Sequence, residues 1–206
     1  MDLSTDWQVT FEGLAAPEPK AFAKLQSWSV SDDPKLRYFS GRARYSRNVT
    51  LHCPTPTLLS NSSVHLSLGE VHDVANVFID GRKIATLWES PYEVEFTPPG
   101  KSFELVVEVV NTWPNRLIGD AIFRRDHPGC EKMGDPKVWH AWEAKNVDPP
   151  KSGIFPQWVL DERADSGVGV HTWSNYSWAW SADDALLPAG LIGPGRIGCR
   201  KQGGER

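Results

Sequence analysis

The stretch from Val106 to Asp120, V-V-E-V-V-N-T-W-P-N-R-L-I-G-D, decides the fold, and its first half is the end of a strand. From Phe103 to Val110 one face carries only Phe, Leu and Val, while the other mixes Val with Glu104 and Glu108. This period of two, in a segment rich in Val, predicts a β-strand with one fully buried face and one mixed face.

The second half, Asn111 to Asp120, leaves the strand at a Trp-Pro step, because proline cannot donate a hydrogen bond to a sheet. We expect a turn in which Arg116 and Asp120 form a buried ion pair, since charged residues set among Trp, Leu and Ile need a partner. The alternative is that Asn111, Asn115 and Arg116 donate hydrogen bonds to a ligand oxygen.

Short strands separated by turns every 8–12 residues run along the rest of the chain and predict an all-β sandwich. Asp80-Gly81 is a strong hairpin signal between 75–79 and 83–87. We also expect an edge strand over 7–11, a weak helical turn over 21–28, a long strand over 38–51, and closing strands over 167–174 and 192–199.

The motif N-T-W-P-N-R-L-I-G-D resembles the strand exit of the sugar-binding jelly-roll domain of family 2-like glycoside hydrolases, and most of all the copy that ends large α-L-rhamnosidases. Residues 28–45, 66–92 and 186–197 agree with that domain in order, so the resemblance covers the chain from about Trp7 to Ile197. It implies a jelly-roll β-sandwich of the galactose-binding-domain type.

In those enzymes the catalytic carboxylates sit in a separate barrel domain, which we do not expect within these residues. A glycosidase needs two carboxylates facing each other across a cleft. The candidates near the motifs are not paired by their spacing, and hydrolysis is therefore not expected; they are Glu89, Asp120, Asp126 and Glu143.

We expect one domain over residues 1–199 and a disordered tail over 200–206. Residues 121–166 form a Trp- and Pro-rich insertion, far longer than a jelly roll needs to join two strands. Its indoles predict a lid that is tied down on the sandwich rather than a free linker.

Composition excludes several partners. The net charge of −4 argues against nucleic acid, and no run of 18 apolar residues predicts a membrane span. The N-terminus lacks the basic and apolar regions of a secretion signal, which favours a cytoplasmic location, or a secreted one if a leader has been removed. The oligomeric state stays open.

Three widely spaced cysteines, Cys53, Cys130 and Cys199, form no CxxC pair and suggest free thiols in a reducing compartment. The three glycosylation triplets, which begin at Asn48, Asn61 and Asn175, are interpreted as chance matches. No cofactor is expected, although acidic doublets at 32–33 and 183–184 leave room for a structural calcium.

Ten tryptophans are the strongest functional signal, because indole faces stack on sugar rings and on flat apolar ligands. Each of them could instead fill the core. His171 and Tyr176 flank Trp173 and could transfer a proton, or could simply pack. The candidate ligand-binding residues are Trp88, Asn111, Trp113, Asn115, Arg116, Trp139, Trp142, Trp173 and Tyr176; the candidate catalytic residues are His171, Tyr176, Asp120 and Arg116.

Three hypotheses follow. We favour a free-standing jelly-roll protein that binds a glycan or an apolar metabolite in a Trp-lined cleft. Close behind is a recruited biosynthetic enzyme, a cyclase, pericyclase or isomerase, that folds an apolar substrate in the same cleft by orientation alone. The third is a structural protein that has kept the fold and lost the ligand.

Overall fold

The computed structural model describes residues 1–13, 15–52, 62–126 and 180–201. The strands are β1 (Thr5–Glu12), β2 (Lys20–Lys24), β3 (Arg42–Thr50), β4 (Ser62–Ser67), β5 (Glu70–His72), β6 (Val74–Ile79), β7 (Arg82–Leu87), β8 (Glu93–Phe96), β9 (Ser102–Val110), β10 (Gly190–Gly193) and β11 (Arg196–Lys201). The helices are the short η1 (Trp28–Val30) and α1 (Pro34–Arg37), and the longer α2 (Pro114–Asp126).

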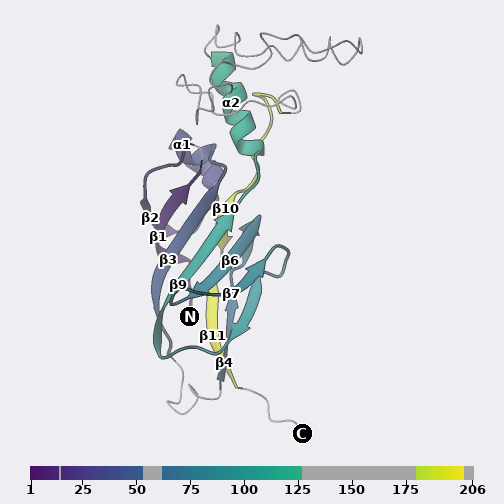
Figure 1. Cartoon of the computed structure of the whole chain (residues 1–206). Helices are drawn as coiled ribbons and strands as arrows, with labels where there is room; N and C mark the ends of the chain where they lie inside the picture. The colour runs from purple at the N-terminus through teal and green to yellow at the C-terminus, as the bar shows by residue number, and fades with distance from the viewer. Residues whose placement is uncertain (14, 53–61, 127–179, 202–206) are drawn as a thin grey trace, which may run out of the picture.

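The strands form the two layers of an antiparallel β-sandwich, which confirms the predicted fold (Figure 1). One layer is a six-stranded sheet in the order β2-β1-β3-β9-β6-β7. The other is built from the three-stranded sheet β11-β4-β8 and the two-stranded sheet β10-β5. The strand predicted from Phe103 is β9, and it lies in the middle of the large sheet between β3 and β6.

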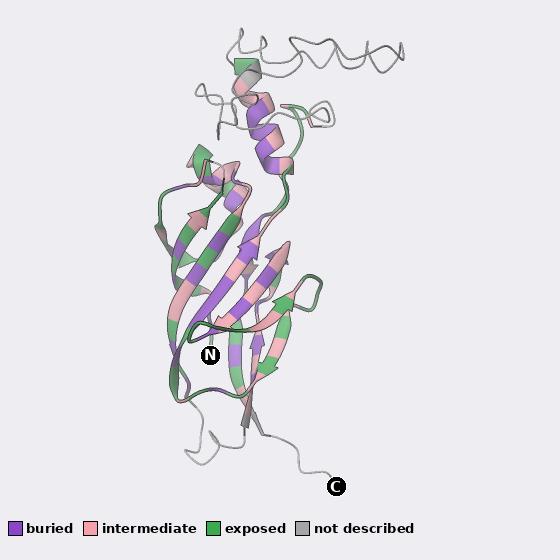
Figure 2. Cartoon of the chain, in the orientation of Figure 1, coloured by how far each residue is buried: buried purple, intermediate pink, exposed green. Residues whose placement is uncertain are grey.

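The core lies between the layers and is rich in aromatic rings. Figure 2 shows buried residues alternating with more exposed ones along the strands. This alternation is expected in a sandwich, where each sheet has one face in the core and one face exposed to solvent. Tyr45 on β3 joins the layers, since its hydroxyl accepts a hydrogen bond from Trp28 Nε1 at 2.6 Å and one from the Leu191 backbone N–H at 3.2 Å.

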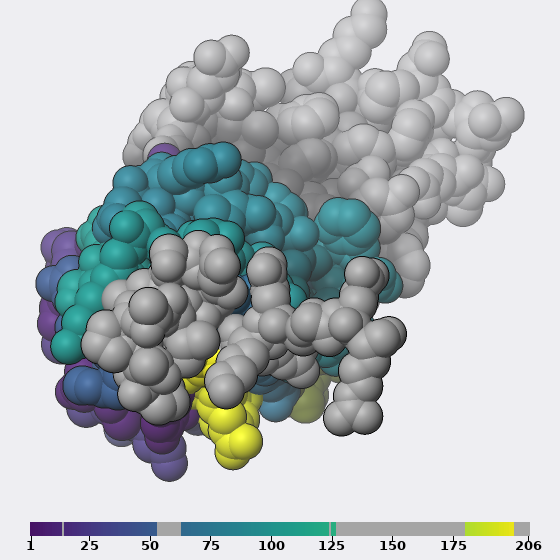
Figure 3. All heavy atoms as spheres, turned by 90° about the horizontal axis from the view of Figure 1, so that it is seen from below, coloured from purple at the N-terminus to yellow at the C-terminus, as the bar shows by residue number. Residues whose placement is uncertain are grey.

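The Asp80-Gly81 hairpin is confirmed, because β6 and β7 pair across these two residues. Both have positive φ, 45° at Asp80 and 77° at Gly81, which is the backbone of a two-residue type I′ turn. The two chain ends also meet: the Met1 carbonyl accepts from the Ile197 N–H at 3.0 Å. Figure 3, which views the sandwich from the end opposite α2, shows the purple N-terminal residues beside the yellow C-terminal strand.

Three predictions near the N-terminus differ from the structure. Residues 20–24 form strand β2 rather than a helical turn, because Phe22 pairs with Trp7 in register and is buried between the layers. As a consequence β1 is not an edge strand: it lies between β2 and β3. The long strand predicted over 38–51 begins later, at Arg42, since 34–37 form α1.

The exit from β9 also differs from the predicted turn. The chain leaves the strand at the Trp-Pro step as expected, but Pro114 then begins helix α2, which extends to Asp126. Proline fits the first position of a helix, where its missing N–H would have no partner in the helix. The predicted insertion therefore starts as helix over 121–126, and its residues 127–166 lie outside the described residues. Of the tail predicted over 200–206, residues 202–206 also lie outside the described residues. Residues 200 and 201 belong to β11, which ends at Lys201.

The prediction of free thiols fails at Cys199, which is disulfide-bonded. Cys53 and Cys130 lie outside the described residues. Cys199 sits on β11, opposite Val64 of β4, in the smaller layer of the sandwich.

Candidate functional site at the loop end

We call the end of the sandwich where β9 runs into α2 the loop end. The sheet register brings several connections together there, because Val110 at the end of β9 pairs with Val74 and with Arg42. Ala75 pairs with Leu87, and His72 pairs with Gly190. The segments that meet at the loop end are therefore 39–41, 72–74, 88–92, 111–116 and 187–189.

Two of the candidate tryptophans follow strands at the loop end and are largely exposed. Trp88 is 68 % exposed and Trp113 is 56 % exposed. Trp88 follows β7 and Trp113 follows β9, the two neighbours of β6, so their strands end about 10 Å apart. By contrast, Trp7 and Trp28 are buried in the core.

Two hollows at the loop end share His72 and Asp73 as lining residues. The first, of about 200 Å³, is lined by His72, Asp73, Asn111, Thr112, Pro114, Asn115, Leu187 and Pro188. The second, of about 450 Å³, is lined by Gly69, Glu70, Val71, His72, Asp73, Ser90 and Tyr92. Trp113 is flanked in sequence by two lining residues of the first hollow, and Trp88 is two residues from the second.

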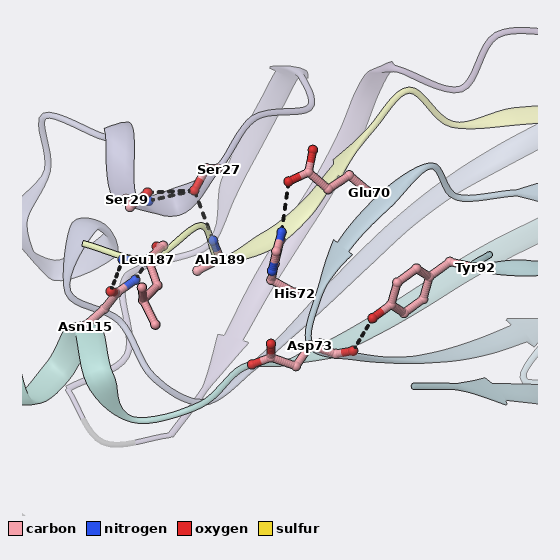
Figure 4. A network of polar contacts seen from close by, with 9 residues as sticks. All are labelled: Ser27, Ser29, Glu70, His72, Asp73, Tyr92, Asn115, Leu187 and Ala189. Carbon is pink, nitrogen blue, oxygen red and sulfur yellow. Dashed lines mark hydrogen bonds and ion pairs between the residues drawn. The ribbon is translucent and has the colours of Figure 1, made fainter. Parts of the chain in front are cut away.

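The Asp73 residue is held in place on three sides. Its backbone N–H donates to the Val110 carbonyl at 3.0 Å, and its carbonyl accepts from the Tyr92 hydroxyl at 2.8 Å (Figure 4). Its carboxylate Oδ2 accepts from the Thr112 N–H at 3.0 Å. Burial raises the pKa of the Tyr92 phenol, and the negative charges of Asp73 and Glu89 add to the effect, so this hydroxyl stays a donor.

His72 is oriented by a carboxylate. Glu70 and His72 point to the same side of β5, while Val71 between them enters the core. His72 Nε2 lies 2.9 Å from Glu70 Oε1, as Figure 4 shows. No hydrogen bond to the other ring nitrogen, Nδ1, occurs in the described part of the chain, so this atom can serve a ligand.

The amides of Asn111 and Asn115, predicted as ligand donors, bind the backbone. Asn111 donates to the Phe39 carbonyl at 3.0 Å and accepts from the Gly41 N–H at 2.9 Å. Asn115 makes the same double contact with Leu187, at 2.8 Å in both directions. Both residues line the first hollow and fix its walls, which is how Asn115 and Leu187 appear in Figure 4.

Arg116 and Asp120 are buried, as predicted, on the same face of α2. Arg116 is 5 % exposed and Asp120 is 1 % exposed, and Arg116 Nη1 lies 4.0 Å from Asp120 Oδ1. Burial lowers the pKa of the Arg116 guanidinium, and the Asp120 carboxylate opposes this shift. Helix α2 approaches the body closely at Gly119, where a Cβ would lie 2.6 Å from the Tyr38 side chain.

The other candidates lie outside the described residues. These are Trp139, Trp142, His171, Trp173 and Tyr176, so their expected roles stay predictions. Sequence reasoning missed Glu70, His72, Asp73 and Tyr92. A usable signal was present in G-E-V-H-D at 69–73, where three ionisable groups stand close together in the sequence.

Other features of the described residues are less suited to a ligand. A third hollow of about 290 Å³ is lined by Asp6, Gln8, Ser46, Arg47, Asn48 and Glu104, none of them aromatic. Within residues 1–13, 15–52, 62–126 and 180–201, no three His, Cys, Asp or Glu side chains are grouped as a metal site would need. In the same ranges, no helix is both long enough and apolar enough to cross a membrane.

The described strands form an all-β sandwich, and comparison with known proteins shows that it is similar to a part of larger glycoside hydrolase-related proteins. No family model matches the chain. A protein of Formosa agariphila named "Putative beta-glucuronidase" is 32% identical over 200 residues, which are 95% of this chain and 15% of that protein. The rhamnosidase from Novosphingobium sp. PP1Y superposes with a TM-score of 0.62 at 28% identity, over 96% of this chain and 14% of the rhamnosidase chain.

The predicted resemblance to rhamnosidases and family 2-like glycoside hydrolases is thereby confirmed. The chain corresponds to about one seventh of the length of each of these larger proteins. The likeness therefore describes a domain and not a whole enzyme.

Proposed function

We propose that this chain binds a glycan at the loop end, with Trp88 and Trp113 stacking on the ligand from either side of the two hollows. The observation that carries the proposal is the exposure of these two indoles, at 68 % and 56 %, each within two residues in sequence of a residue that lines a hollow. A sugar ring has apolar faces and a polar edge, so it needs both kinds of contact.

The energetics of stacking support a ligand. If about 100 Å² of each exposed indole leaves water on binding, the gain is about 2.5 kcal/mol per residue before the entropic costs of association. The polar walls add orientation, because Asp73, His72 and the first hollow are fixed by hydrogen bonds to the backbone and to Glu70. Such preorganised groups lose little freedom when a ligand arrives.

The names of the similar proteins favour a glycan over an apolar metabolite. One is named a rhamnosidase and the other a glucuronidase, so both names refer to sugars. Their whole activity is not transferred here, because this chain matches only about one seventh of each.

A recruited, non-hydrolytic enzyme is the second candidate, and the His72–Glu70 pair favours it. A carboxylate that orients an imidazole is a recurrent acid–base arrangement, and His72 lines both hollows. In that case the cleft would fold a substrate for cyclisation or isomerisation while His72 moves a proton. Turnover of a ligand, rather than its simple retention, would distinguish this function.

A secreted location is the better supported of the two expectations on localisation. The disulfide at Cys199 supports it, since disulfides persist in oxidising compartments.

A glycan array probed with the full chain and its variants tests the proposed function. We expect binding to at least one glycan class, and a loss of about tenfold or more in affinity for Trp88→Ala and for Trp113→Ala. Gln8→Ala, in the third hollow, is the matched control and should bind like the parent chain. Equal weakening by all three variants, or none by the Trp variants, would place binding elsewhere.

A further inference from the structure

We infer that the loop end takes a neutral, hydroxyl-bearing sugar and rejects sugar acids, with Asp73 and His72 as the residues that contact the ligand's hydroxyls. This inference rests on the proposed glycan-binding function and adds the chemical class of the ligand. It follows from which polar atoms in the two hollows remain available and from the charges around them.

Two acceptor atoms of the described lining residues are available to a ligand. Asp73 uses carboxylate Oδ2 for the Thr112 N–H, and no hydrogen bond to its Oδ1 occurs in the described residues. His72 offers Nδ1 in the same way. Among the described lining residues, Asn111, Asn115 and Tyr92 each donate one hydrogen bond to a backbone carbonyl, so these bonds hold the walls of the hollows. An ionised carboxylate accepts and never donates, so a pair of sugar hydroxyls suits Asp73 Oδ1 and a ligand carboxylate does not.

The charges around the two hollows also favour a neutral sugar over a sugar acid. Glu70 and Asp73 line the hollows, and none of the described residues that line either hollow is a Lys or an Arg. Glu89 lies near enough for its charge to act on Tyr92. Arg116, one residue beyond the lining residue Asn115, is buried beside Asp120 and is not a lining residue. Without an opposing cation, a ligand carboxylate would meet net negative charge and lose its hydration.

Glu70 has a positioning role in this scheme. Its carboxylate holds His72 Nε2, which fixes the ring and leaves Nδ1 as the ring nitrogen available to the ligand. A histidine whose second nitrogen is bonded to a carboxylate keeps a defined orientation, as ligand-contacting histidines generally do.

The experiment compares sugars that differ only at one carbon. Full-length chain is titrated, with amide resonances followed by NMR, against methyl β-D-glucopyranoside and methyl β-D-glucuronide, and against the matching galactoside and galacturonide. For any pair of which one member binds, we expect the neutral sugar to bind about fivefold or more tightly, the size of a single charge–charge contact at 4 Å in water. The difference in affinity between the neutral and the acidic sugar should decrease in 1 M salt, where the screening length falls to about 3 Å.

Charge-removing variants test which carboxylates cause the preference for the neutral sugar. Asp73→Asn and Glu70→Gln keep the side-chain shape and remove one negative charge each, so the preference for the neutral sugar should shrink to about twofold or less. Glu104→Gln removes a charge in the third hollow, six residues before Val110 on β9, and should leave the preference unchanged. If a variant fails to fold, the salt series on the parent chain still tests whether the preference for the neutral sugar is electrostatic.

The possible outcomes distinguish a failure of the inference on neutral sugars from a failure of the proposed glycan binding. A glucuronide or galacturonide that binds as tightly as its neutral partner, or more tightly, overturns the inference and leaves glycan binding standing. A preference for the neutral sugar that survives high salt and both charge-removing variants also overturns it. A chain that binds none of these sugars, and none on the array, overturns the proposed function together with the inference.

Discussion

His72 Nε2 and Glu70 Oε1 lie 2.9 Å apart on the outer side of β5, at the point where the two hollows of the loop end meet. Both side chains reach solvent, with 32% of the His72 side chain and 56% of the Glu70 side chain exposed. A pair in this position adds little to stability, since exposed ion pairs are worth about 0–1 kcal/mol. We therefore expect the pair to matter for the proposed ligand more than for the stability of the fold.

Replacing Glu70 should separate these two roles. Glu70→Ala is expected to lower the free energy of unfolding by less than about 1 kcal/mol, because the pair is solvent-screened. Ligand affinity should nevertheless fall, since the His72 ring loses its orientation. Urea unfolding and ligand titration of the same variant measure the two effects, and a large loss of stability with unchanged affinity would contradict this expectation.

Arg116 should matter for stability far more than a surface arginine on the same helix. Arg116→Ala leaves Asp120 buried without its ion pair, and we expect a loss of about 3–5 kcal/mol. Arg125→Ala is the control: its side chain is 55% exposed and is bonded to Asp126, so it should cost less than about 1 kcal/mol. Equal melting temperatures for the two variants would show that the α2 pair does not hold the helix to the body.

The Tyr45 hydroxyl joins the two layers, and removing it should be costly. Tyr45→Phe leaves the Trp28 Nε1–H and the Leu191 N–H without their acceptor in the core, which we expect to destabilise by about 1–3 kcal/mol. Tyr92→Phe removes a hydroxyl at a more exposed position and should cost about 1 kcal/mol or less. Denaturant midpoints of the two variants compare them, and a smaller effect at Tyr45 would contradict this account of the core.

The disulfide at Cys199 can be checked chemically. In a non-reduced digest, we expect the peptide that carries Cys199 to be cross-linked, and to react with an alkylating reagent only after reduction. Cys199→Ser should then lower stability by about 2–4 kcal/mol in the oxidised protein. Full alkylation of Cys199 in the unfolded, non-reduced chain would show a free thiol.

The sequence predicted those parts of the fold whose physical cause is local. The alternation of side chains is enough to predict β9. Asp80-Gly81 is enough to predict the hairpin between β6 and β7, because the positive φ that the turn needs is favoured by these two residue types. The burial of Arg116 and Asp120 was also predictable, since charges among Leu and Ile require partners.

The elements that were missed depend on distant contacts or on an ambiguous pattern. Residues 20–24 form a strand because Trp7 offers Phe22 a partner across the sheet, and that contact leaves no mark in the segment itself. Helix α2 was missed although Pro114 suits its first position and Arg116 and Asp120 have helical spacing. The short segment that carries His72 has no clear strand pattern, and only pairing of β5 with β10 brings it beside Leu187 and Pro188.

The most direct test of ligand binding follows the indole N–H signals of the tryptophans in ¹H–¹⁵N spectra while a glycan identified on the array is added. The signals of Trp88 and Trp113 are assigned by single substitution to Phe. We predict that these two signals shift in a saturable manner, together with the amides of His72 and Asp73, while the buried Trp7 and Trp28 signals stay in place. Saturable shifts centred on Gln8 and Glu104, with Trp88 and Trp113 unmoved, would contradict the account and assign the ligand to the third hollow.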